Sequence, residues 1–438
     1  MHFIDKSKVR KQMKKKGFKN QVELANSLGI TKNQLSKILS IDYDFLKSNI
    51  RELCNLLEID IIDIISKKPK DQCNLEKNQN SLLPIFITSE NFIDTSKVTA
   101  QNKYNVVEFF AGAGGLALGL DRSGFNTVFL NEFDKDAVAT LTFNRPKWNI
   151  VEDDICNIVK NGVKNYLPPN IEIDLISGGY PCQAFSYAGK GLGLEDARGT
   201  LFYPFAKAIE ELQPKMFLAE NVKGLTTHDN GNTLKTMIEV YESLGYSVQY
   251  KILNALNYGV AQKRERVVIV GIRKDLKELY NLEYQFPKPY DQTYTLRDVL
   301  IDVPKSECPS YSEKKFAVLD LVPPGGCWRD LPDEIAKEYM GASYYLGGGK
   351  TGMARRLSWN EPGLTILCSP SQKQTERCHP DETRPFSVRE NARIQSFPDE
   401  WEFKGSVASK YKQIGNAVPV NFAEAIGKSI INTLNKII

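Results

Sequence analysis

One cysteine of this chain stands where a reactive thiol is as plausible as a packed one. Cys182 follows Pro181 in the stretch GGYPCQAFSYAGK, residues 178–190, which otherwise consists of glycine, small residues and aromatics. The apolar run IEIDLIS, residues 171–177, precedes it and predicts a strand. Because ligands of open α/β sheets bind beyond the carboxyl ends of the strands, this position suits a nucleophile. A buried structural cysteine is the alternative that the stretch alone leaves open.

A glycine-rich junction supplies a second candidate site. The stretch EFFAGAGGLALGL, residues 108–120, predicts a strand that runs into a helix with three glycines at the turn. Glycine lets the backbone approach a ligand closely, and the first amides of a helix are free donors. Dinucleotide-binding folds use a similar loop, so the motif alone is weak. The following strand ends in Glu132, which fits a ribose diol, and Asp154 and Ile155 would fit an adenine amine and ring. Since nothing in the loop demands a pyrophosphate, S-adenosylmethionine is favoured over a nicotinamide dinucleotide.

Further polar motifs follow in a fixed order along the chain. They are FFAGAGG, NE, DI, GGYPCQAFS, ENV with Glu220, QKRER with Arg264 and Arg266, RRLSWNEP and QIGNAVPV. Together they resemble the DNA (cytosine-5) methyltransferase family, and the resemblance covers residues 104–438. One departure is Glu108, where many members carry aspartate, but the charge is kept.

The resemblance implies a role for each motif. Cys182 would add to carbon 6 of cytosine, Glu220 would hold a proton near ring nitrogen 3, and Arg264, with Arg266 beside it, would anchor the carbonyl oxygen of the base. A buried ion pair between Glu220 and Arg264 is the structural alternative. Twelve residues are expected to bind the cofactor: Phe110, Gly112, Ala113, Gly115, Glu132, Phe133, Asp154, Ile155, Pro181, Leu201, Asn416 and Val418.

Two stretches are expected to contact double-stranded DNA near the target base. Cytosine in a duplex hides carbon 6, so the base must be flipped out. The stretch QAFSYAGKGLGLEDARGT, residues 183–200, carries Lys190 and Arg198 and predicts a loop that closes over DNA; an ordinary surface loop is the alternative. Residues 368–385 carry side chains suited to the major groove, among them Gln372, Lys373 and Arg377. These residues specify no recognition sequence; a short palindrome is expected by analogy.

The N-terminal residues are basic and helical in pattern. Residues 1–70 hold 15 Lys and Arg against 8 Asp and Glu, whereas the remainder holds 42 against 45. The stretch LANSLGITKNQLSKIL resembles a phage-repressor helix-turn-helix, with Thr31 as the N-cap of the second helix. That helix would present to DNA the polar residues Lys32, Asn33, Gln34, Ser36 and Lys37. A small helical bundle that binds protein is the alternative.

Apolar strands that alternate with helices from residue 104 predict an α/β fold with a parallel sheet. We expect a Rossmann-like, S-adenosylmethionine-dependent methyltransferase domain with a small irregular recognition lobe, after an all-α helix-turn-helix domain. The expected boundaries are a helix-turn-helix domain at 1–66, a linker at 67–103, catalytic parts at 104–272 and 386–438, and a recognition lobe at 273–385.

Composition excludes several classes of protein. No apolar run approaches the roughly 18 residues of a membrane span, and no secretory leader is present, so a cytoplasmic, nucleoid-associated protein is expected. The eight cysteines contain no C-x-x-C pair and only three histidines exist, which argues against disulfides and against a metal site.

The sequence therefore predicts a site-specific DNA cytosine-5 methyltransferase that acts as a monomer on its site. It would protect host DNA from a cognate restriction endonuclease, with the N-terminal domain repressing its own gene. The alternatives are a tRNA cytosine-5 methyltransferase and a DNA-binding regulator that keeps a passive methyltransferase scaffold.

Overall fold

The structure is a computed structural model of the whole chain. It describes residues 2–4, 6–18, 20–28, 35, 57, 65–67, 92–181, 200–345, 352–370, 372 and 375–437. The chain divides into two compact units, Met1–Leu82 and Leu83–Ile438. Each unit is described by itself below.

The described residues of the N-terminal unit include two helices and a short strand pair. Helix α1 (Lys6–Lys15) is followed by α2 (Gln21–Ser27), and the Asn20 side chain caps α2 by accepting hydrogen bonds from its first amides. Strand β1 (His2–Ile4) pairs antiparallel with β2 (Ile65–Lys67). The prediction of an all-α domain is therefore wrong, because backbone pairing joins the two ends of the unit. Apart from Leu35, the predicted second helix of the helix-turn-helix lies outside the described residues.

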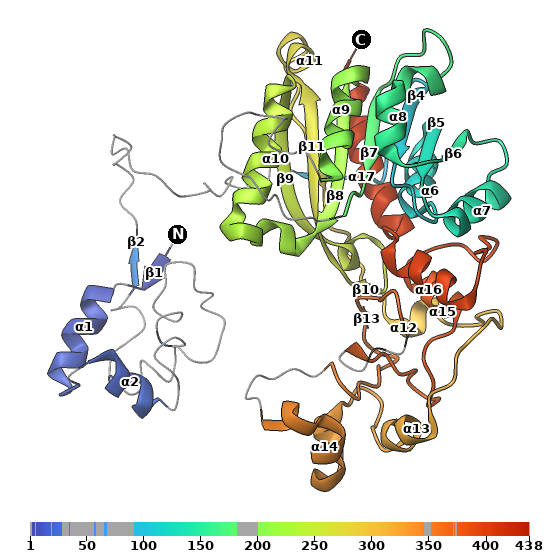
Figure 1. Cartoon of the computed structure of the whole chain (residues 1–438). Coiled ribbons are helices and arrows are strands. Elements are labelled where there is room, and N and C mark those ends of the chain that lie inside the picture. The colour runs from blue at the N-terminus through green and yellow to red at the C-terminus, as the bar shows by residue number, and fades with distance from the viewer. Residues whose placement is uncertain are drawn as a thin grey trace. The chain divides into compact units, whose positions relative to one another are not determined.

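The larger unit is built on a seven-stranded sheet with the order β6-β5-β4-β7-β8-β11-β9 (Figure 1). The strands are β4 (Tyr104–Phe109), β5 (Phe125–Glu132), β6 (Ile150–Glu152), β7 (Leu175–Gly178), β8 (Met216–Val222), β9 (Tyr246–Asn254) and β11 (Glu265–Arg273). The chain first places β5 and β6 on one side of β4 and then continues with β7 on the other side. This reversal of direction creates the crevice where α/β proteins bind ligands.

The sheet is mixed and not parallel as predicted. Strand β11 runs antiparallel to both β8 and β9, while the other pairings are parallel. The chain reaches β11 from β9 through residues 255–264, too short a connection to contain a crossover helix. Strands β6 and β9 were not predicted. β6 has only three residues, and β9 is an edge strand whose residues are mostly half-exposed, so neither gives a continuous apolar run.

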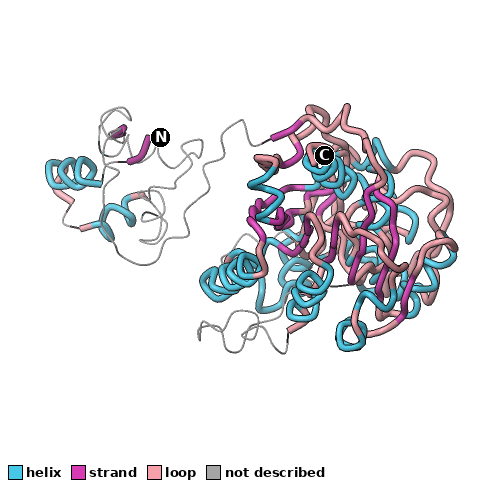
Figure 2. The backbone as a smooth tube through the Cα atoms, turned by 90° about the horizontal axis from the view of Figure 1, so that it is seen from above, coloured by secondary structure: helices cyan, strands magenta, loops and turns pink. Residues whose placement is uncertain are grey.

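Helices cover both faces of this sheet (Figure 2). On one face lie α6 (Gly115–Ser123) and the final helix α17 (Val420–Leu434), whose apolar side chains share a core with β4, β8 and β11. On the other face α8 (Ile155–Asn161), α9 (Phe202–Leu212) and α10 (Asn232–Ser243) pack in a second core. Glycines allow α6 and α17 to touch: a Cβ on Gly119 would lie 2.6 Å from the carbonyl oxygen of Val420. The C-terminal segment is thereby held next to the glycine loop.

Some residues on either side of the expected catalytic domain pack with it. Strand β3 (Phe92–Ile93), inside the expected linker, pairs with β12 (Phe286–Pro287). Helix α11 (Lys274–Leu279) and β12 contribute Leu276 and Phe286 to the core of the first sheet face. Segments on both sides of residues 104–272 therefore pack with the same sheet.

The recognition lobe has its own small core, which begins near residue 311. The core includes the buried side chains of Tyr311, Leu319, Val322, Leu331, Ala336, Tyr339, Ala354 and Cys378. Helices α13 (Glu313–Asp320) and α14 (Asp333–Met340) lie in this described part of the chain. The chain enters and leaves the lobe through α12 (Leu296–Val299) and β13 (Gly363–Leu364), and β13 pairs with β10 (Gln262–Lys263). It then returns to the body through α15 (Val388–Ile394) and α16 (Val407–Asn416).

Two features are absent from the described residues. None of their helices is long and apolar enough to cross a membrane. Nor do they contain a cluster of three or more His, Cys, Asp or Glu side chains that could hold a metal ion.

Candidate active site

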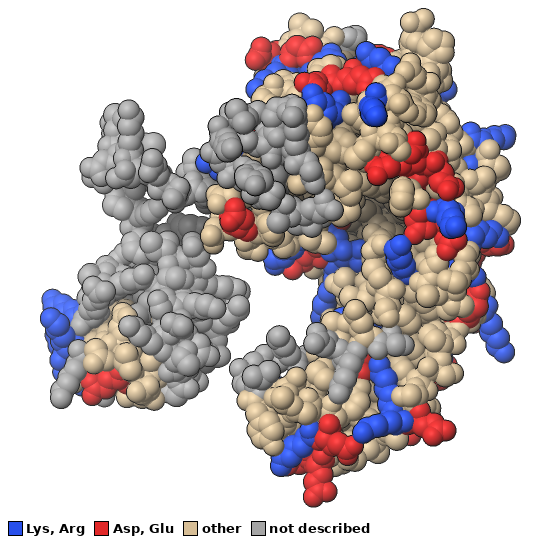
Figure 3. Space-filling view, in the orientation of Figure 1, with Lys and Arg blue, Asp and Glu red and all other residues tan. Residues whose placement is uncertain are grey.

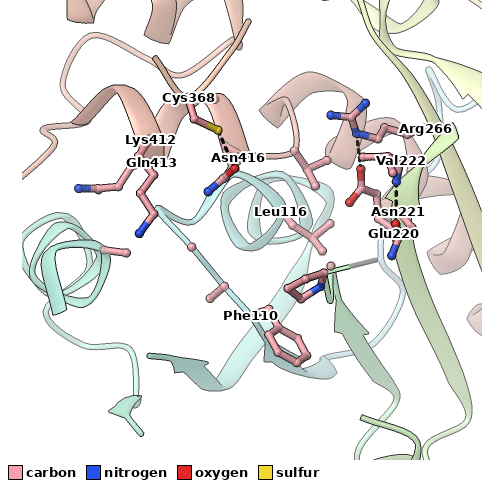
Figure 4. A pocket seen from close by; sticks show the side chains of 18 of the residues that line it. Phe110, Leu116, Glu220, Asn221, Val222, Arg266, Cys368, Lys412, Gln413 and Asn416 are labelled. Carbon is pink, nitrogen blue, oxygen red and sulfur yellow. Dashed lines mark hydrogen bonds and ion pairs between the residues drawn. The ribbon is translucent and has the colours of Figure 1, made fainter. Parts of the chain in front are cut away.

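A cavity of about 650 Å³ opens at the carboxyl ends of β4, β5, β7 and β8 (Figure 4). The strand ends form one wall, and the C-terminal segment around α16 forms the opposite wall. In Figure 4 Glu220 and Arg266 lie at one side, Cys368 and Asn416 at the other, with Phe110 and Leu116 between them. The cavity thus joins parts of the chain that are about 300 residues apart in sequence.

The glycine loop after β4 is held in an uncommon backbone conformation. Phe110 has a positive φ of 56°, which a bulky side chain rarely adopts, and Gly112 follows with a φ of 55°. A Cβ on Gly112 would meet no atom within 4 Å, so the backbone borders open space there. Gly114 has no such room, because its Cβ would lie 3.0 Å from the ring of Trp401. Trp401 also donates a 3.2 Å hydrogen bond to the carbonyl oxygen of Ala113 and so fixes the loop from behind.

Glu132, at the end of β5, has its carboxylate held by backbone amides. One oxygen accepts a 2.7 Å hydrogen bond from Gly112, and the other accepts bonds from Phe133 at 2.9 Å and Asp134 at 2.8 Å. Each carboxylate oxygen can accept more than one bond, so the group can still accept a pair of hydroxyls. At the same side of the cavity, Lys412 of α16 forms a 2.7 Å ion pair with Asp134.

Glu220, near the end of β8, places a buried carboxyl group in the cavity. It forms a 2.8 Å ion pair with the Nε of Arg266, and both side chains are only 12% exposed. Burial raises the pKa of Glu220 above its usual value, although Arg266 and Arg264 act in the opposite direction. A Cβ on Gly179 would lie 3.2 Å from its second oxygen, so the carboxyl faces the turn after β7.

Arg264 is buried beside this pair but has other partners. Its guanidinium donates to the carbonyl oxygens of Gly415 at 2.9 Å and Ala417 at 3.0 Å, and more weakly to Ile366 at 3.4 Å. Burial and the neighbouring Arg266 lower the pKa of Arg264 to about 9. The considered ion pair between Glu220 and Arg264 is therefore not formed; Arg266 takes that place, and Arg264 attaches the C-terminal segment to the cavity wall.

Hydrogen bonds hold the turn that leads to Cys182, whose last described residue is Pro181. Asn221 donates a 2.8 Å hydrogen bond to the carbonyl oxygen of Tyr180, whose hydroxyl lies 3.1 Å from that of Tyr241 in the core. Pro181 lines the cavity. Cys182 itself lies outside the described residues.

Comparison with known proteins identifies the family. The model of the family described as C-5 cytosine-specific DNA methylase matches residues 104–432, three quarters of the chain. The chain belongs to this family. It is a DNA cytosine-5 methyltransferase, and enzymes of this family use S-adenosyl-L-methionine as methyl donor.

Individual relatives agree with this assignment. The methyltransferase is 53% identical to the type II methyltransferase M.Sau96I of Staphylococcus aureus over 99% of both chains. It is 57% identical to the type II methyltransferase M.PspPI of Psychrobacter sp. (strain TA137) over 77% of this chain and 81% of that one. Its fold matches a candidate DNA modification methyltransferase encoded within an E. coli prophage, with a TM-score of 0.56 and 25% identity, over 76% of this chain and all of that one.

The cavity of the methyltransferase gathers many, but not all, of the residues expected from its sequence. Those that line it are Phe110, Gly112, Glu132, Pro181, Glu220, Arg264, Arg266, Asn416 and Val418. Ala113 and Gly115 lie behind the loop, and a Cβ on Gly115 would collide with the carbonyl oxygen of Val418. Asp154 caps α8 by accepting from the amide of Cys156, Ile155 is buried, and Leu201 precedes α9. Phe133 is 73% exposed at the end of β5.

Most of the expected DNA contacts cannot be placed in the structure. Outside the described residues lie Lys32, Asn33, Gln34, Ser36, Lys37, Lys190, Arg198 and Lys373. Gln372 is exposed in the recognition lobe, and Arg377 is partly buried there.

Sequence reasoning missed several residues that shape the cavity. Gln262 and Gln395 are fully buried and bonded to each other at 2.9 Å, and Gln395 also donates to the carbonyl oxygen of Ile414 at 2.7 Å. The Cys368 thiol donates a 2.9 Å bond to the Asn416 side chain. Gln262 belongs to the QKRER motif, so the sequence offered a signal for it. Trp401 and Gln395 stand in no such motif, and nothing in the sequence indicates their contacts.

Proposed function

We propose that the methyltransferase modifies carbon 5 of a flipped-out cytosine in duplex DNA through a covalent adduct with Cys182. The thiolate adds to carbon 6, the new C–S bond forms, and ring nitrogen 3 takes a proton. Carbon 5 is then nucleophilic and takes the methyl group from the donor sulfonium. Loss of the carbon 5 proton and cleavage of the C–S bond restore the aromatic ring and release the thiol.

Glu220 supplies the proton to ring nitrogen 3. A general acid must be protonated before the addition step, and a carboxyl group with an ordinary pKa would be ionised at neutral pH. Burial in the cavity raises the pKa of Glu220 and so favours the protonated acid. Its position against the turn at Gly179 supports a role next to the nucleophile. This pairing of a buried acid with the turn before Cys182 carries the proposal.

Arg266, rather than Arg264, is the better candidate to meet the base. The guanidinium of Arg266 reaches Glu220 through its Nε, and one terminal nitrogen donates to the carbonyl oxygen of Glu265 at 2.8 Å. The other terminal nitrogen can donate to the carbonyl oxygen of a cytosine. Arg264 donates to three backbone carbonyl oxygens and thereby positions the wall that carries Asn416. Because charge grows on the ring during addition, a fixed cation beside it lowers the barrier.

The residues of the cavity fit S-adenosylmethionine. The open space beside Gly112 admits a ligand against the backbone, and the Glu132 carboxylate, already oriented by three amides, suits a ribose diol. Phe110 and Val418 border the same space, and Asn416 offers a side-chain amide. The cofactor supplies an electrophilic methyl group when bound; the protein orients it and excludes water.

A mechanism-based trap tests the proposal. Bisulfite sequencing of DNA from cells with and without the gene first gives the modified site, and a duplex with 5-fluorocytosine at that site is then incubated with enzyme and cofactor. Fluorine cannot leave as a cation, so a stable protein–DNA adduct should appear on a denaturing gel. Cys182→Ala should give none, whereas the matched control Cys156→Ser, at an exposed cysteine, should give the wild-type amount. An adduct formed by Cys182→Ala would overturn the assignment of the nucleophile.

We further propose that the enzyme protects its host's DNA against a cognate restriction endonuclease. Its similarity to type II methyltransferases over its whole length supports this role. In this role it acts in the cytoplasm on nucleoid DNA and binds its site as a monomer. Loss of the gene should leave the same DNA site cleavable in a cell that carries the endonuclease.

The N-terminal residues 1–66 are proposed to repress the enzyme's own gene. The basic excess of this region, the helix-turn-helix pattern and helix α2 support the idea. Deletion of residues 1–70 should leave methylation of short duplexes largely intact and raise expression from a promoter fusion. An unchanged reporter, with no footprint upstream of the gene, would leave only general DNA affinity as the role of this unit.

A further inference from the structure

Two segments of the recognition lobe lie side by side and are joined in parallel at one bridge, Arg356 to Cys378. They are residues 352–357 and 376–378, and three backbone hydrogen bonds join them. Glu376 donates to Gly352 at 2.9 Å, Cys378 to Arg355 at 3.0 Å and Leu357 to Cys378 at 3.0 Å. The pairing places Arg356 opposite Cys378, so that Arg355 and Arg377 occupy the preceding positions of the two segments.

Side chains of these segments differ in burial. Ala354, Arg356, Glu376 and Cys378 are at most 4% exposed and face the core of the lobe. Arg355 and Arg377 directly precede the bridged residues Arg356 and Cys378, and they lie close enough together for the charge of Arg355 to lower the pKa of Arg377. Both are only partly buried. The segments therefore present two neighbouring guanidinium groups.

The inward charges have partners. Arg356 donates to the carbonyl oxygens of Leu319 and Val322 at 2.7 and 2.6 Å, and to the hydroxyl of Thr383. The buried carboxylate of Glu376 accepts from the hydroxyl of Tyr339 and pairs with Lys315 at 3.0 Å. These contacts hold the two segments rigidly against the lobe.

The outward arginines, Arg355 and Arg377, differ in this respect. Among the described residues no carboxylate pairs with either, and the Nε of each is buried without an acceptor. The only hydrogen bond of the Arg377 side chain to a described residue is to the carbonyl oxygen of Glu376. Burial and the charge of Arg355 lower the pKa of Arg377 to about 10. Two like charges held together with no acid among their described neighbours are suited to an electron-rich ligand.

This face borders the catalytic cavity. Arg377 lines a small hollow together with Ile366 and Leu367, and the latter two also line the cavity that holds Glu220. Figure 3 shows lysine and arginine side chains along the surface between the catalytic body and the lobe. A duplex that delivers a base to the cavity therefore has to pass close to these residues.

We propose that Arg355 and Arg377 determine sequence specificity by donating to the major-groove edges of guanines beside the target cytosine. This inference rests on the proposed function of the cavity. The major groove admits a two-stranded ribbon, and a guanidinium fork matches the O6 and N7 acceptors of guanine. Since the Nε atoms of Arg355 and Arg377 are buried, their terminal nitrogens are the donors that would meet a base. Contact with phosphates is the competing outcome of the test; rigid anchoring of the segments favours bases, because base readout needs a fixed geometry.

The experiment uses the full-length enzyme and a duplex library with randomised positions around the modified cytosine. Wild type should require guanine at two or more positions. Arg377→Ala and Arg355→Ala should each relax the requirement at a different position, lowering the preference for guanine by about 10–100-fold. Arg377→Lys should relax it as well, because an ammonium keeps the charge but loses the fork. The matched control Arg329→Ala, an exposed arginine of the same lobe stacked on Trp328, should keep the wild-type preference.

Other outcomes would overturn the inference. A uniform loss on all sequences, rescued by Arg377→Lys and with a smaller salt dependence, would assign the arginines to phosphates. An unchanged preference in every variant would place them outside the interface. Thermal unfolding shows whether the alanine variants fold, and if they do not, the lysine variants decide. Failure of the proposed function is distinguishable, because wild type would then form no 5-fluorocytosine adduct at all.

Discussion

The arginines of the catalytic cavity and those of the recognition lobe differ in their bonding partners. In the cavity, Arg264 is bound to backbone carbonyls and Arg266 to the Glu220 carboxylate. In the lobe, Arg355 and Arg377 project from a rigid support with no carboxylate among their described neighbours. A reaction centre must stabilise a charge that develops on one small ring, so its cations are held in place beforehand. The surface that we propose to read DNA would meet acceptors only when the duplex arrives, so its donors stay available until then.

The largest effect should come from Glu220→Gln, which removes the proposed general acid from the cavity and leaves the lobe unchanged. An amide cannot donate a proton to ring nitrogen 3, so kcat should fall by about 10²–10⁴-fold. In wild type the acid must be protonated, and burial raises its pKa; activity should therefore decline as pH rises through that pKa. Single-turnover rates against pH check both points. A wild-type rate in Glu220→Gln would remove the residue from the mechanism.

Next in size is Arg266→Ala, which removes the cation beside the acid. The rate at neutral pH should fall by about 100-fold through loss of a donor to the base. Removing the positive charge should also raise the pKa of Glu220 further, because Arg266 stabilises the ionised carboxylate. The alkaline limb of the pH–rate profile should therefore move to higher pH. The same profile in Arg355→Ala serves as a control, since a lobe arginine should leave the limb in place.

A smaller effect is expected for Glu132→Ala, on the cofactor side of the cavity. Loss of the bonds from its carboxylate should weaken binding of S-adenosylmethionine by about 1–3 kcal/mol, as measured by calorimetry. Asp154→Ala should also weaken it, although in the structure Asp154 caps α8 outside the cavity lining. Unchanged affinity in both variants would remove these residues from the cofactor site.

The smallest effect on catalysis should come from the inward carboxylate of the lobe. Glu376→Gln loses the charge that pairs with Lys315, so the free energy of unfolding should fall by about 1–3 kcal/mol. The single-turnover rate at saturating DNA should stay near wild type, in contrast to Glu220→Gln. Glu338→Gln, at an exposed partner of Lys314, is the matched control and should leave stability unchanged. If Glu376→Gln lost as much rate as Glu220→Gln, the lobe carboxylate would have a catalytic role as well, and the distinction between the two regions would be wrong.

The sequence predicted the motifs of the cavity better than the sheet that carries them. Glycine loop, Glu132, Glu220 and the QIGNAVP segment were named from residue types, because the chemistry of each is local. The edge strands β6 and β9 were not predicted, and β11 was expected in a parallel sheet but runs antiparallel. Strand direction depends on how the chain returns to the sheet, and an edge strand is half-exposed, so neither leaves a clear apolar pattern.

The sequence by itself determined the family, the cofactor class and the order of the motifs, since these depend on residue identity and spacing. Only the tertiary structure decided which arginine pairs with Glu220, because Arg264 and Arg266 are two residues apart and equally suited by type. It also brought Trp401 against Ala113 and set Arg355 beside Arg377. Such contacts join residues far apart in the chain, and no local pattern records them: packing and the pairing of extended segments fix which side chains meet.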